Sequence, residues 1–399
     1  MRSSLFIFVM VVFLTGPAPQ RAEAASVYSM VLVGERVESG DVRAIALGGS
    51  AQLISDSLGV LYSNPALLSR TRAVTLGITQ VLAMDEGRSD DYTERDNSFL
   101  FPTLKVSFPI MGRFVLSTGY MSRYDPDGSF TLDGVTESGD EYTTRFTKSG
   151  GLFSVPLIIA ADVTRFVSVG ASFSFEAGNV EERWEREFED PDFVPGAGFQ
   201  REDLKGTSFG GGLVLRPFEK VMIGGSYQSE IDYETEVSRI FTNASLNTSS
   251  TSTAKLPARV SAAATVGLGS WLFLGSYAWS DFAEFEGFGF PTDRLGMETS
   301  YAFGVEYGGV SIGNKKLPIR VSFNYQELPF DHPRDSSIEK FLVGIGSGLI
   351  VRNGSAKFDF AIQAGKVGAL NTNGLEDRLI RVYVGLVGAE RWTRRAGRQ

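Results

Sequence analysis

The sequence predicts an all-β protein: a transmembrane antiparallel β-barrel of about 14 strands, with an N-terminal hatch (plug) inside its lumen. Three features predict this architecture. An export signal begins the chain, segments of about ten residues alternate between apolar and polar positions, and the connections between them are alternately short and long.

The first residues are typical of a secretory signal peptide. Arg2 is followed by an apolar run over residues 5–14 and then by Ala22-Glu23-Ala24, which has the A-x-A form of a cleavage site. A membrane helix is the alternative, but it needs about 20 apolar residues. We therefore predict that residues 1–24 are removed and that the protein is exported.

Alternation within the strands favours a membrane barrel over a soluble sandwich. Arg320, Ser322 and Asn324 share one face of their segment, whereas Ile319 and Val321 lie on the other. One face is wholly apolar and the other carries polar groups, which suits lipid outside and a polar lumen inside. The same pattern occurs in four segments: 167–176, 300–307, 318–326 and 355–365.

The lengths of the connections give the stronger argument. Connections after even-numbered strands are tight, such as the single Gly269, whereas those after odd-numbered strands are long and polar, such as residues 181–204. Short periplasmic turns and long external loops are typical of outer-membrane barrels, and a sandwich has no reason to show them. The predicted strands are 72–83, 98–109, 113–124, 151–161, 165–180, 205–216, 220–233, 256–268, 270–281, 299–309, 317–327, 337–351, 355–366 and 378–389.

Residues 25–71 precede the predicted barrel of residues 72–399 and are too irregular to be a strand or a helix. Irregular backbone cannot face lipid, because its N–H and C=O groups would lack partners, but it can lie against a polar lumen wall. We therefore predict a hatch that fills the pore. Its marked residues are Gly48, Gly49, Asp56, Asn64, Pro65 and Ala66.

The stretch "DVRAIALGGSAQLISDSLGVLYSNPALL" resembles the hatch of the FadL-type family of outer-membrane long-chain fatty acid and hydrocarbon transporters. "LPARVSAAATVGLGSWLFLGSYAWSDF" and "SYAFGVEYGG…LPIRVSFNYQELPF" are similar to later hairpins of that family. The mature N-terminus, "ASVYSMVLVGERVESGDVR", does not match the family, which leaves the substrate open.

The resemblance implies a mechanism of transport. A hydrophobic compound, such as a fatty acid or hydrocarbon, is caught among the external loops and enters an apolar pocket beside the hatch. A shift of the hatch then opens a lateral gap at a kinked third strand. Gly119 is the candidate for this kink, since a strand glycine often marks a bend, although an ordinary lumen glycine explains it equally well.

Aromatic residues in predicted loops suggest an outer groove for an apolar ligand, with loops packing on each other as the alternative. The candidates are Phe188, Phe193, Val194, Phe199, Phe282, Phe285, Phe288 and Phe290. Arg320, Lys357 and Arg381 face the lumen and could bind a substrate carboxylate, but more often such cations pair with lumen acids such as Glu306 and Asp359.

Composition and charge limit the other functions. The 399 residues include no cysteine and one histidine, His332, which excludes thiol catalysis and multi-histidine metal sites. A hydrolase would need histidine as a base, and a loop histidine beside acids is more often solvated, so we expect no enzyme, cofactor or metal site. The net charge of −9 argues against nucleic acid as a partner.

Two questions about partners remain open in the sequence. A related group of barrels serves the type IX secretion machinery as a scaffold or shuttle, and it shares the Gly-rich hatch and the Asn-Pro-Ala turn. We expect a monomer in the outer membrane of a Gram-negative cell, in contact with lipid and lipopolysaccharide. The acidic segment 85–96 could hold cations that bridge lipopolysaccharide, but it lacks EF-hand spacing and is more typical of a solvated loop.

Overall fold

The computed structural model describes residues 28–49, 53–54, 58–59, 63–89, 93–110, 113–190, 192–241, 247–287, 295–312, 315–332, 336–351 and 355–390. The predicted signal peptide lies outside these residues and stays a prediction. Among the described residues, no helix is long and apolar enough to cross a membrane.

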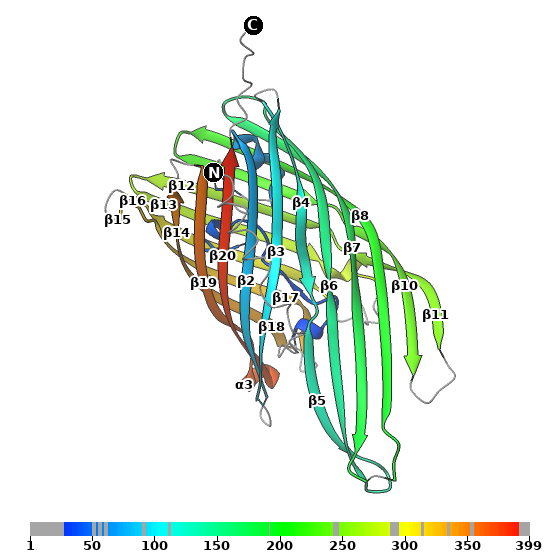
Figure 1. Cartoon of the computed structure of the whole chain (residues 1–399). Helices are drawn as coiled ribbons and strands as arrows, with labels where there is room; N and C mark the ends of the chain where they lie inside the picture. The colour runs from blue at the N-terminus through cyan, green and yellow to red at the C-terminus, as the bar shows by residue number, and fades with distance from the viewer. Residues whose placement is uncertain are drawn as a thin grey trace, which may run out of the picture.

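Fourteen antiparallel strands close into a ring, which confirms the predicted fold class (Figure 1). The last strand, β20, pairs with the first, β2, over residues 74–89 and 375–390, and thereby closes the barrel. The ring strands are β2 (Val74–Ser89), β3 (Thr93–Ile110), β4 (Phe114–Asp125), β6 (Glu141–Asp162), β7 (Val167–Phe188), β8 (Gly196–Phe218), β9 (Val221–Gln228), β12 (Arg259–Leu268), β13 (Trp271–Asp281), β14 (Met297–Tyr307), β17 (Ile319–His332), β18 (Ser336–Val351), β19 (Ala356–Ala369) and β20 (Leu375–Glu390).

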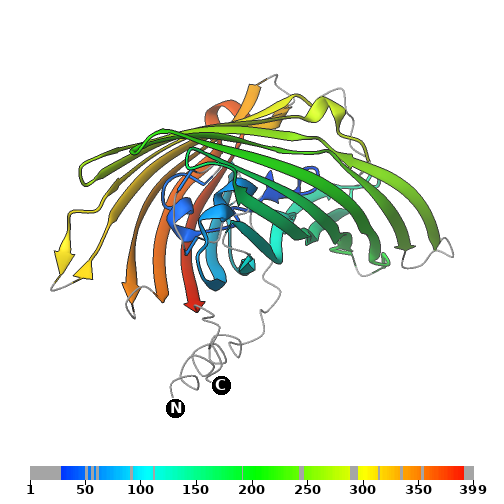
Figure 2. The same cartoon turned by 90° about the horizontal axis from the view of Figure 1, so that it is seen from above.

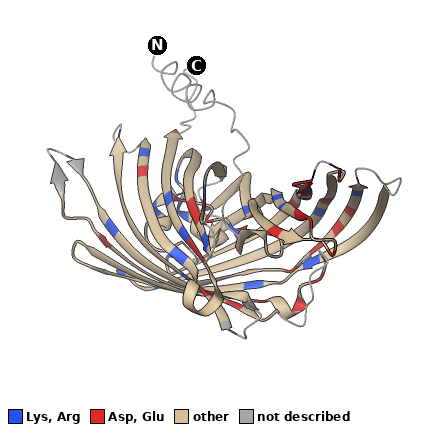
Figure 3. Ribbon diagram, turned by 90° about the horizontal axis from the view of Figure 1, so that it is seen from below, with Lys and Arg blue, Asp and Glu red and all other residues tan. Residues whose placement is uncertain are grey.

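The two faces of the strands follow the predicted alternation. On β17, Ile319 and Val321 are 44% and 48% exposed on the outside, whereas Arg320 and Ser322 are 3% and 5% exposed on the lumen side. Charged residues occur along the barrel strands and on the N-terminal segment (Figure 3), and buried ones include Arg320, Lys357 and Asp359. A lumen this polar can satisfy the backbone groups of a segment that lies within it.

Several strands continue beyond the barrel on one side, where the sequence had predicted loops (Figure 1). The prediction of a long loop over residues 181–204 was wrong: β7 runs to Phe188 and β8 begins at Gly196. The described residues of the acidic segment 85–96, residues 85–89 and 93–96, likewise belong to β2 and β3, and Arg95 pairs with Glu86 at 2.6 Å. Strands outside the membrane need no apolar face. Cross-strand ion pairs therefore stabilise this part of the sheet, and its residues do not alternate between apolar and polar as they do in the membrane part.

Three further strands widen this projection, which we call the external extension. β5 (Gly128–Val135) pairs with β6, β10 (Ile231–Phe241) pairs with β8, and β11 (Thr248–Leu256) pairs with β10. β10 follows β9 along the edge of β8, so the two are successive parts of one interrupted strand.

The N-terminal segment, residues 28–71, lies inside the barrel (Figure 2). It contains four short elements: η1 (Tyr28–Met30), β1 (Glu35–Arg36), α2 (Val42–Ile45) and η2 (Pro65–Arg70). The remaining elements belong to connections: η3 (Phe282–Glu284), β15 (Ser311–Ile312), β16 (Lys315–Lys316) and α3 (Leu370–Asn373). Where each part of the N-terminal segment contacts the wall defines the candidate site.

Candidate functional site

The Asn-Pro-Ala turn begins η2 and fixes it to the wall. Asn64 caps the helix by accepting a 3.0 Å hydrogen bond from the N–H of Ala66, and Pro65 occupies the first helical position, where its missing N–H costs nothing. The Asn64 amide also donates to the carbonyl of Gly225 at 3.2 Å. Gly212 leaves room for this side chain, since a Cβ there would collide with it.

Gly48 and Gly49 end α2 in conformations that only glycine adopts easily, with φ of +105° and +79°. The carbonyl of Gly48 accepts a 2.8 Å hydrogen bond from the amide of Asn324 on β17. The space that a side chain on Gly49 would need is occupied by the carboxylate of Glu38. Asp56, the remaining predicted hatch residue, lies outside the described residues.

Buried ion pairs connect α2 to the wall. Arg43 forms two hydrogen bonds to Glu306 on β14, at 2.6 and 2.8 Å. Glu306 also accepts from Arg320 on β17 at 2.7 Å, and Arg320 reaches Asp359 on β19 at 2.7 Å. One chain of alternating charges therefore joins the hatch to three strands.

Lys357 on β19 extends this chain of charges back to the hatch. Its ammonium lies 2.8 Å from Asp359 and 3.2 Å from Asp41, the residue that caps α2. Arg320 and Lys357, which the sequence offered as contacts for a substrate carboxylate, thus contact carboxylates of this chain.

A second ion cluster holds β1. Glu35 binds Arg381 on β20 and Lys340 on β18. Burial would raise the pKa of the Glu35 carboxyl, but the two cations outweigh it and lower the pKa to about 2. Glu35 is therefore charged over the whole physiological range, and Arg381, the third predicted lumen cation, is its partner.

The barrel wall is interrupted beside its third strand, β4. In the described residues β3 and β4 pair no further than Thr103 opposite Met121, although β4 continues to Asp125. Beyond Met121, toward its C-terminal end, β4 pairs with β1 instead of β3, and Glu35 lies opposite Asp125. The N-terminal segment thus supplies a two-residue strand where the wall lacks one.

The other side of β4 is interrupted as well. Its pairing with β6 skips Gly119 and Tyr120, and Pro156 occupies the position opposite Gly119. Proline has no N–H to donate to a neighbouring strand, which explains the break. Gly119, the predicted kink, lies at this interruption.

Cavities lie on both sides of the interruption. A recess of about 560 Å³ reaches from lipid-side residues such as Phe153 to lumen-side residues such as Leu152. A smaller cavity of about 40 Å³ lies on the lumen side, beside Glu35. The two share Leu100 on β3 and Asp125 on β4, so both border the gap between these strands, and Glu35 and Arg36 of β1 line the smaller one.

The lumen cavity beside the hatch is polar. It has a volume of about 140 Å³, and its lining includes nine serines together with Arg36, Glu38, Arg123 and Arg259. This cavity is therefore not the apolar pocket implied by the resemblance; a mostly apolar cavity of about 40 Å³, whose lining includes Leu32, Val33 and Phe330, lies elsewhere against the N-terminal segment.

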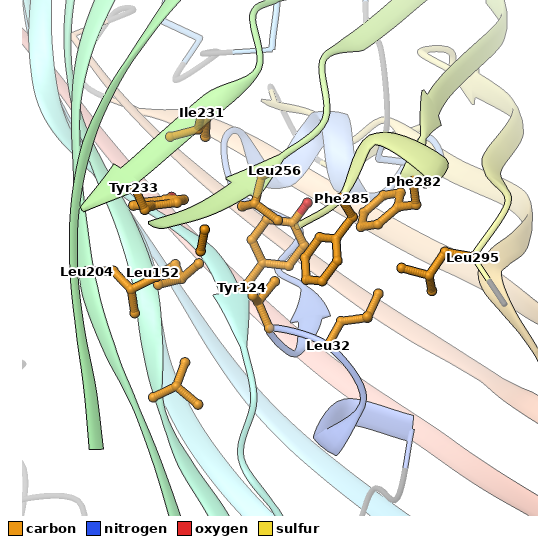
Figure 4. Packing of buried hydrophobic residues seen from close by; sticks show 13 residues of the cluster. Leu32, Tyr124, Leu152, Leu204, Ile231, Tyr233, Leu256, Phe282, Phe285 and Leu295 are labelled. Carbon is orange, nitrogen blue, oxygen red and sulfur yellow. The ribbon is translucent and has the colours of Figure 1, made fainter. Parts of the chain in front are cut away.

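Apolar side chains gather instead near the external end of the lumen, where they pack against one another (Figure 4). Phe282 and Phe285, two of the residues proposed for an outer groove, are 2% and 0% exposed in this cluster. The buried members are Leu32, Val33, Tyr124, Leu152, Val180, Leu204, Ile231, Tyr233, Ala254, Leu256, Phe282, Phe285 and Leu295.

The other proposed groove residues are separated from this cluster. Phe188 and Phe193 stack on each other with ring centroids 5.0 Å apart, and Val194 is exposed beside them. Phe199 lies opposite Arg183 and so points to the other face of the external extension. Phe288 and Phe290 are outside the described residues, so the described part of the set does not form one groove.

The closed ring with the N-terminal segment in its lumen defines the fold, a transmembrane β-barrel with an internal hatch, and solved FadL-type barrels share this fold. The structure of a Pseudomonas aeruginosa FadL homologue aligns with a TM-score of 0.61 at 11% identity, over 89% of this chain and 99% of the other. The Pseudomonas putida toluene transporter TodX aligns at 0.57 and 13% identity, over 88% and 98%. The CymD monoaromatic hydrocarbon channel aligns at 0.56 and 14% identity, over 88% and 98%.

The chain belongs to the BamG family, whose sequence profile matches residues 1–397. No curated protein matches the chain. The resemblance to FadL-type barrels is confirmed at the level of fold, because identities of 11–14% do not carry a substrate from one protein to another.

Sequence reasoning missed β1 and the gap that it fills. Two signals could have indicated them: Pro156 interrupts an otherwise regular strand, and Pro126 follows directly after β4. The pairing of Glu35 with Arg381 and Lys340 had no sequence signal, because more than 300 residues separate Glu35 from either cation.

Proposed function

We propose that this barrel moves hydrophobic compounds, such as long-chain fatty acids or hydrocarbons, from the cell surface into the outer membrane through the gap between β3 and β4. The observation that carries the proposal is that two cavities share lining residues at this gap, where β1 pairs with β4 and lines the smaller cavity. Lateral exit keeps an apolar chain out of water, where each exposed CH₂ costs about 0.8 kcal/mol.

In this proposal β1 is the gate, and the rest of the hatch stays in place. The ion pairs of Arg43 with Glu306 on β14 and of Asp41 with Lys357 on β19 hold α2 against the wall. β1 pairs with β4 through two residues, Glu35 and Arg36, and a two-residue strand adds little stability of its own.

A reversible lock tests the gate. The chain has no cysteine, so Glu35→Cys with Asp125→Cys introduces a single disulfide across β1 and β4, at a separation that paired strands provide. We expect the oxidised protein in lipid vesicles to stop the uptake of a fluorescent fatty acid, and a reductant to restore it.

The matched control introduces a disulfide between two strands of the barrel wall whose pairing is not interrupted. Val266→Cys with Phe273→Cys joins paired residues of β12 and β13 on the lipid side. This variant should transport at the wild-type rate in both redox states. Unchanged uptake by the locked β1–β4 protein would rule out exit past β1.

A second candidate is a scaffold for exported proteins, as in a type IX-like secretion system. It is favoured by the polar lumen cavity and by the external extension, whose last strand, β11, is exposed over residues 248–253. An unpaired edge strand is a template for another chain. Photocrosslinking from a photoreactive residue at Thr251 to identified exported proteins, lost when Thr253→Pro is added to the same strand, would favour this candidate, as would a barrel that contains no lipophilic compound.

A further inference from the structure

A cluster of arginines lies where the N-terminal segment leaves the barrel at its periplasmic end. Arg70 ends η2, and Arg72 follows it after one residue. Arg216 lies near the end of β8, close to the tight turn that leads to β9, and its N–H donates to the carbonyl of Phe166. One acid, Asp162 at the end of β6, faces these three cations.

The hydrogen bonds of Asp162 are already taken. Its Oδ1 accepts from the hydroxyls of Ser69, at 2.7 Å, and Ser168, at 2.5 Å. Its Oδ2 accepts from Arg72 at 3.1 Å. Arg216 reaches the acid only indirectly, because its Nη1 donates to the Ser168 hydroxyl at 2.7 Å.

Two of the guanidinium groups keep donors without acceptors. The Nε and Nη2 atoms of Arg216 and the Nε atom of Arg70 are buried and have no hydrogen-bond partner. Arg216 as a whole is 8% exposed. A buried donor without a partner destabilises a fold, and repulsion from Arg70 and Arg72 adds to this cost.

The charge at this place is unbalanced. Three arginines against one aspartate leave a net charge of +2 (three minus one) around the unpartnered nitrogens. A tetrahedral oxyanion offers several acceptor oxygens, and guanidinium groups bind phosphate through paired N–H donors. A phosphate group satisfies both the unpartnered donors and the excess charge.

We propose that Arg70, Arg72 and Arg216 form a phosphate-binding site at the periplasmic end of the barrel. The half-exposed side chain of Arg72 lies at its outer side, and the buried Arg216 forms its floor. The bound phosphate ties η2 to β8 and holds the periplasmic end of the lumen closed. The site is independent of the route between β3 and β4.

Two sources supply this chemistry, free phosphate in the periplasm and the headgroup of a phospholipid in the inner leaflet. The test is thermal unfolding of protein purified in a non-ionic detergent without phosphate. Inorganic phosphate is added in one arm of this experiment and phosphatidylglycerol in the other. Binding to the folded state raises the midpoint of unfolding, and we expect a rise of about 2–4 °C. A rise with inorganic phosphate indicates the free anion, and a rise with lipid alone indicates the headgroup.

Arg216→Met should fold at least as stably as the wild type without ligand, because it removes the unpartnered donors, and it should lose the response. Arg70→Met is the second variant if Arg216→Met does not fold. Arg113→Gln, an exposed arginine in the turn before β4, is the control that keeps the response. No rise in either arm, or the same rise in Arg216→Met and Arg70→Met, would overturn the site.

Discussion

The wall formed by β13, β14, β17, β18 and β19 differs from the wall formed by β3, β4 and β6. In the first, neighbouring strands pair in register through the membrane part without a break; β13 and β14 pair from Trp271 to Asp281 and β18 and β19 from Lys340 to Val351. In the second, the pairing of β4 with β3 ends at Met121, and the pairing of β4 with β6 is interrupted at Gly119 and Tyr120. One wall is complete, and the other needs β1.

The N-terminal segment is attached differently to each wall. Ion pairs of Arg43 and Asp41 join α2 to the complete wall, whereas a two-residue backbone ladder joins β1 to the interrupted one. The N-terminal segment therefore has two roles: α2 is a fixed anchor, and β1 is a strand that can be removed from the wall. Variants on each side should therefore have different effects.

The largest loss of stability is expected for Arg320→Met, on the complete wall. The change removes the cation that Glu306 and Asp359 share. Each acid keeps a second cation, Arg43 and Lys357 respectively, so the cost should approach and not exceed about 3–5 kcal/mol, the cost of a fully broken buried pair. Urea unfolding of the protein in phospholipid vesicles measures this loss. Arg183→Gln, at a half-exposed pair with Glu185, is the control and should cost less than about 1 kcal/mol.

A smaller loss is expected for Gly304→Ala on β14. A Cβ at this position would lie 2.5 Å from the carbonyl oxygen of Leu47, just after α2, so the hatch must shift. Overpacking of this kind costs about 1–3 kcal/mol. Gly275→Ala on β13 is the matched control, since a Cβ there meets no atom within 4 Å. Equal stability of the two variants in the same urea titration would contradict a closely packed anchor.

The two walls also differ in how far the sequence predicted them. The alternation of apolar and polar residues predicted that Arg320, Ser322 and Asn324 face the lumen of the complete wall. Lipid outside and polar groups inside impose this period of two on every membrane strand. The same rule could not show β1, because backbone pairing depends on position in space rather than on residue type. It also failed in the external extension, where no lipid selects an apolar face.

The candidate site was predicted less completely than the fold. Asn64 and Pro65 could be marked in the sequence because their local role, capping a helix, depends on adjacent residues. The aromatic residues Phe188 and Phe282 could not be placed, because the sequence does not say which loops meet. Their separation reflects the external extension, which moves Phe188 away from the lumen cluster that contains Phe282.

Glu35→Gln should open β1 without unfolding the barrel. It removes the charge that binds Arg381 and Lys340, and hydrogen bonds to charged groups contribute about 1.5–3 kcal/mol. We expect the hydrogen-exchange protection of a peptide covering residues 28–38 to fall by about tenfold or more. Peptides from β17 and β18 are the internal control and should keep their protection.

The pH dependence of β1 follows from the same residue. The pKa of Glu35 is lowered from 4.5 to about 2, so its stabilising charge is complete above pH 4.5 and is lost as the pH falls toward 2. The contribution of Glu35, measured as the difference in protection of residues 28–38 between the wild type and Glu35→Gln at each pH, should be constant from pH 7 to 4.5 and decrease below. A decrease in this protection that begins near neutral pH would mean that a titratable group other than Glu35 holds β1 in place.

The smallest effect, with the opposite sign, is expected for Glu38→Gln. Burial raises the pKa of the Glu38 carboxyl, and the cations around it, Lys340 and Arg259 foremost, only partly offset that cost. The charged form therefore destabilises the folded hatch at neutral pH, and this cost is relieved as the pH falls. Glu38→Gln should gain less than about 1 kcal/mol at pH 7, seen as higher protection of residues 28–38. Two carboxylates three residues apart would then act in opposite directions, and a loss of protection in Glu38→Gln would mean that both hold β1 in place.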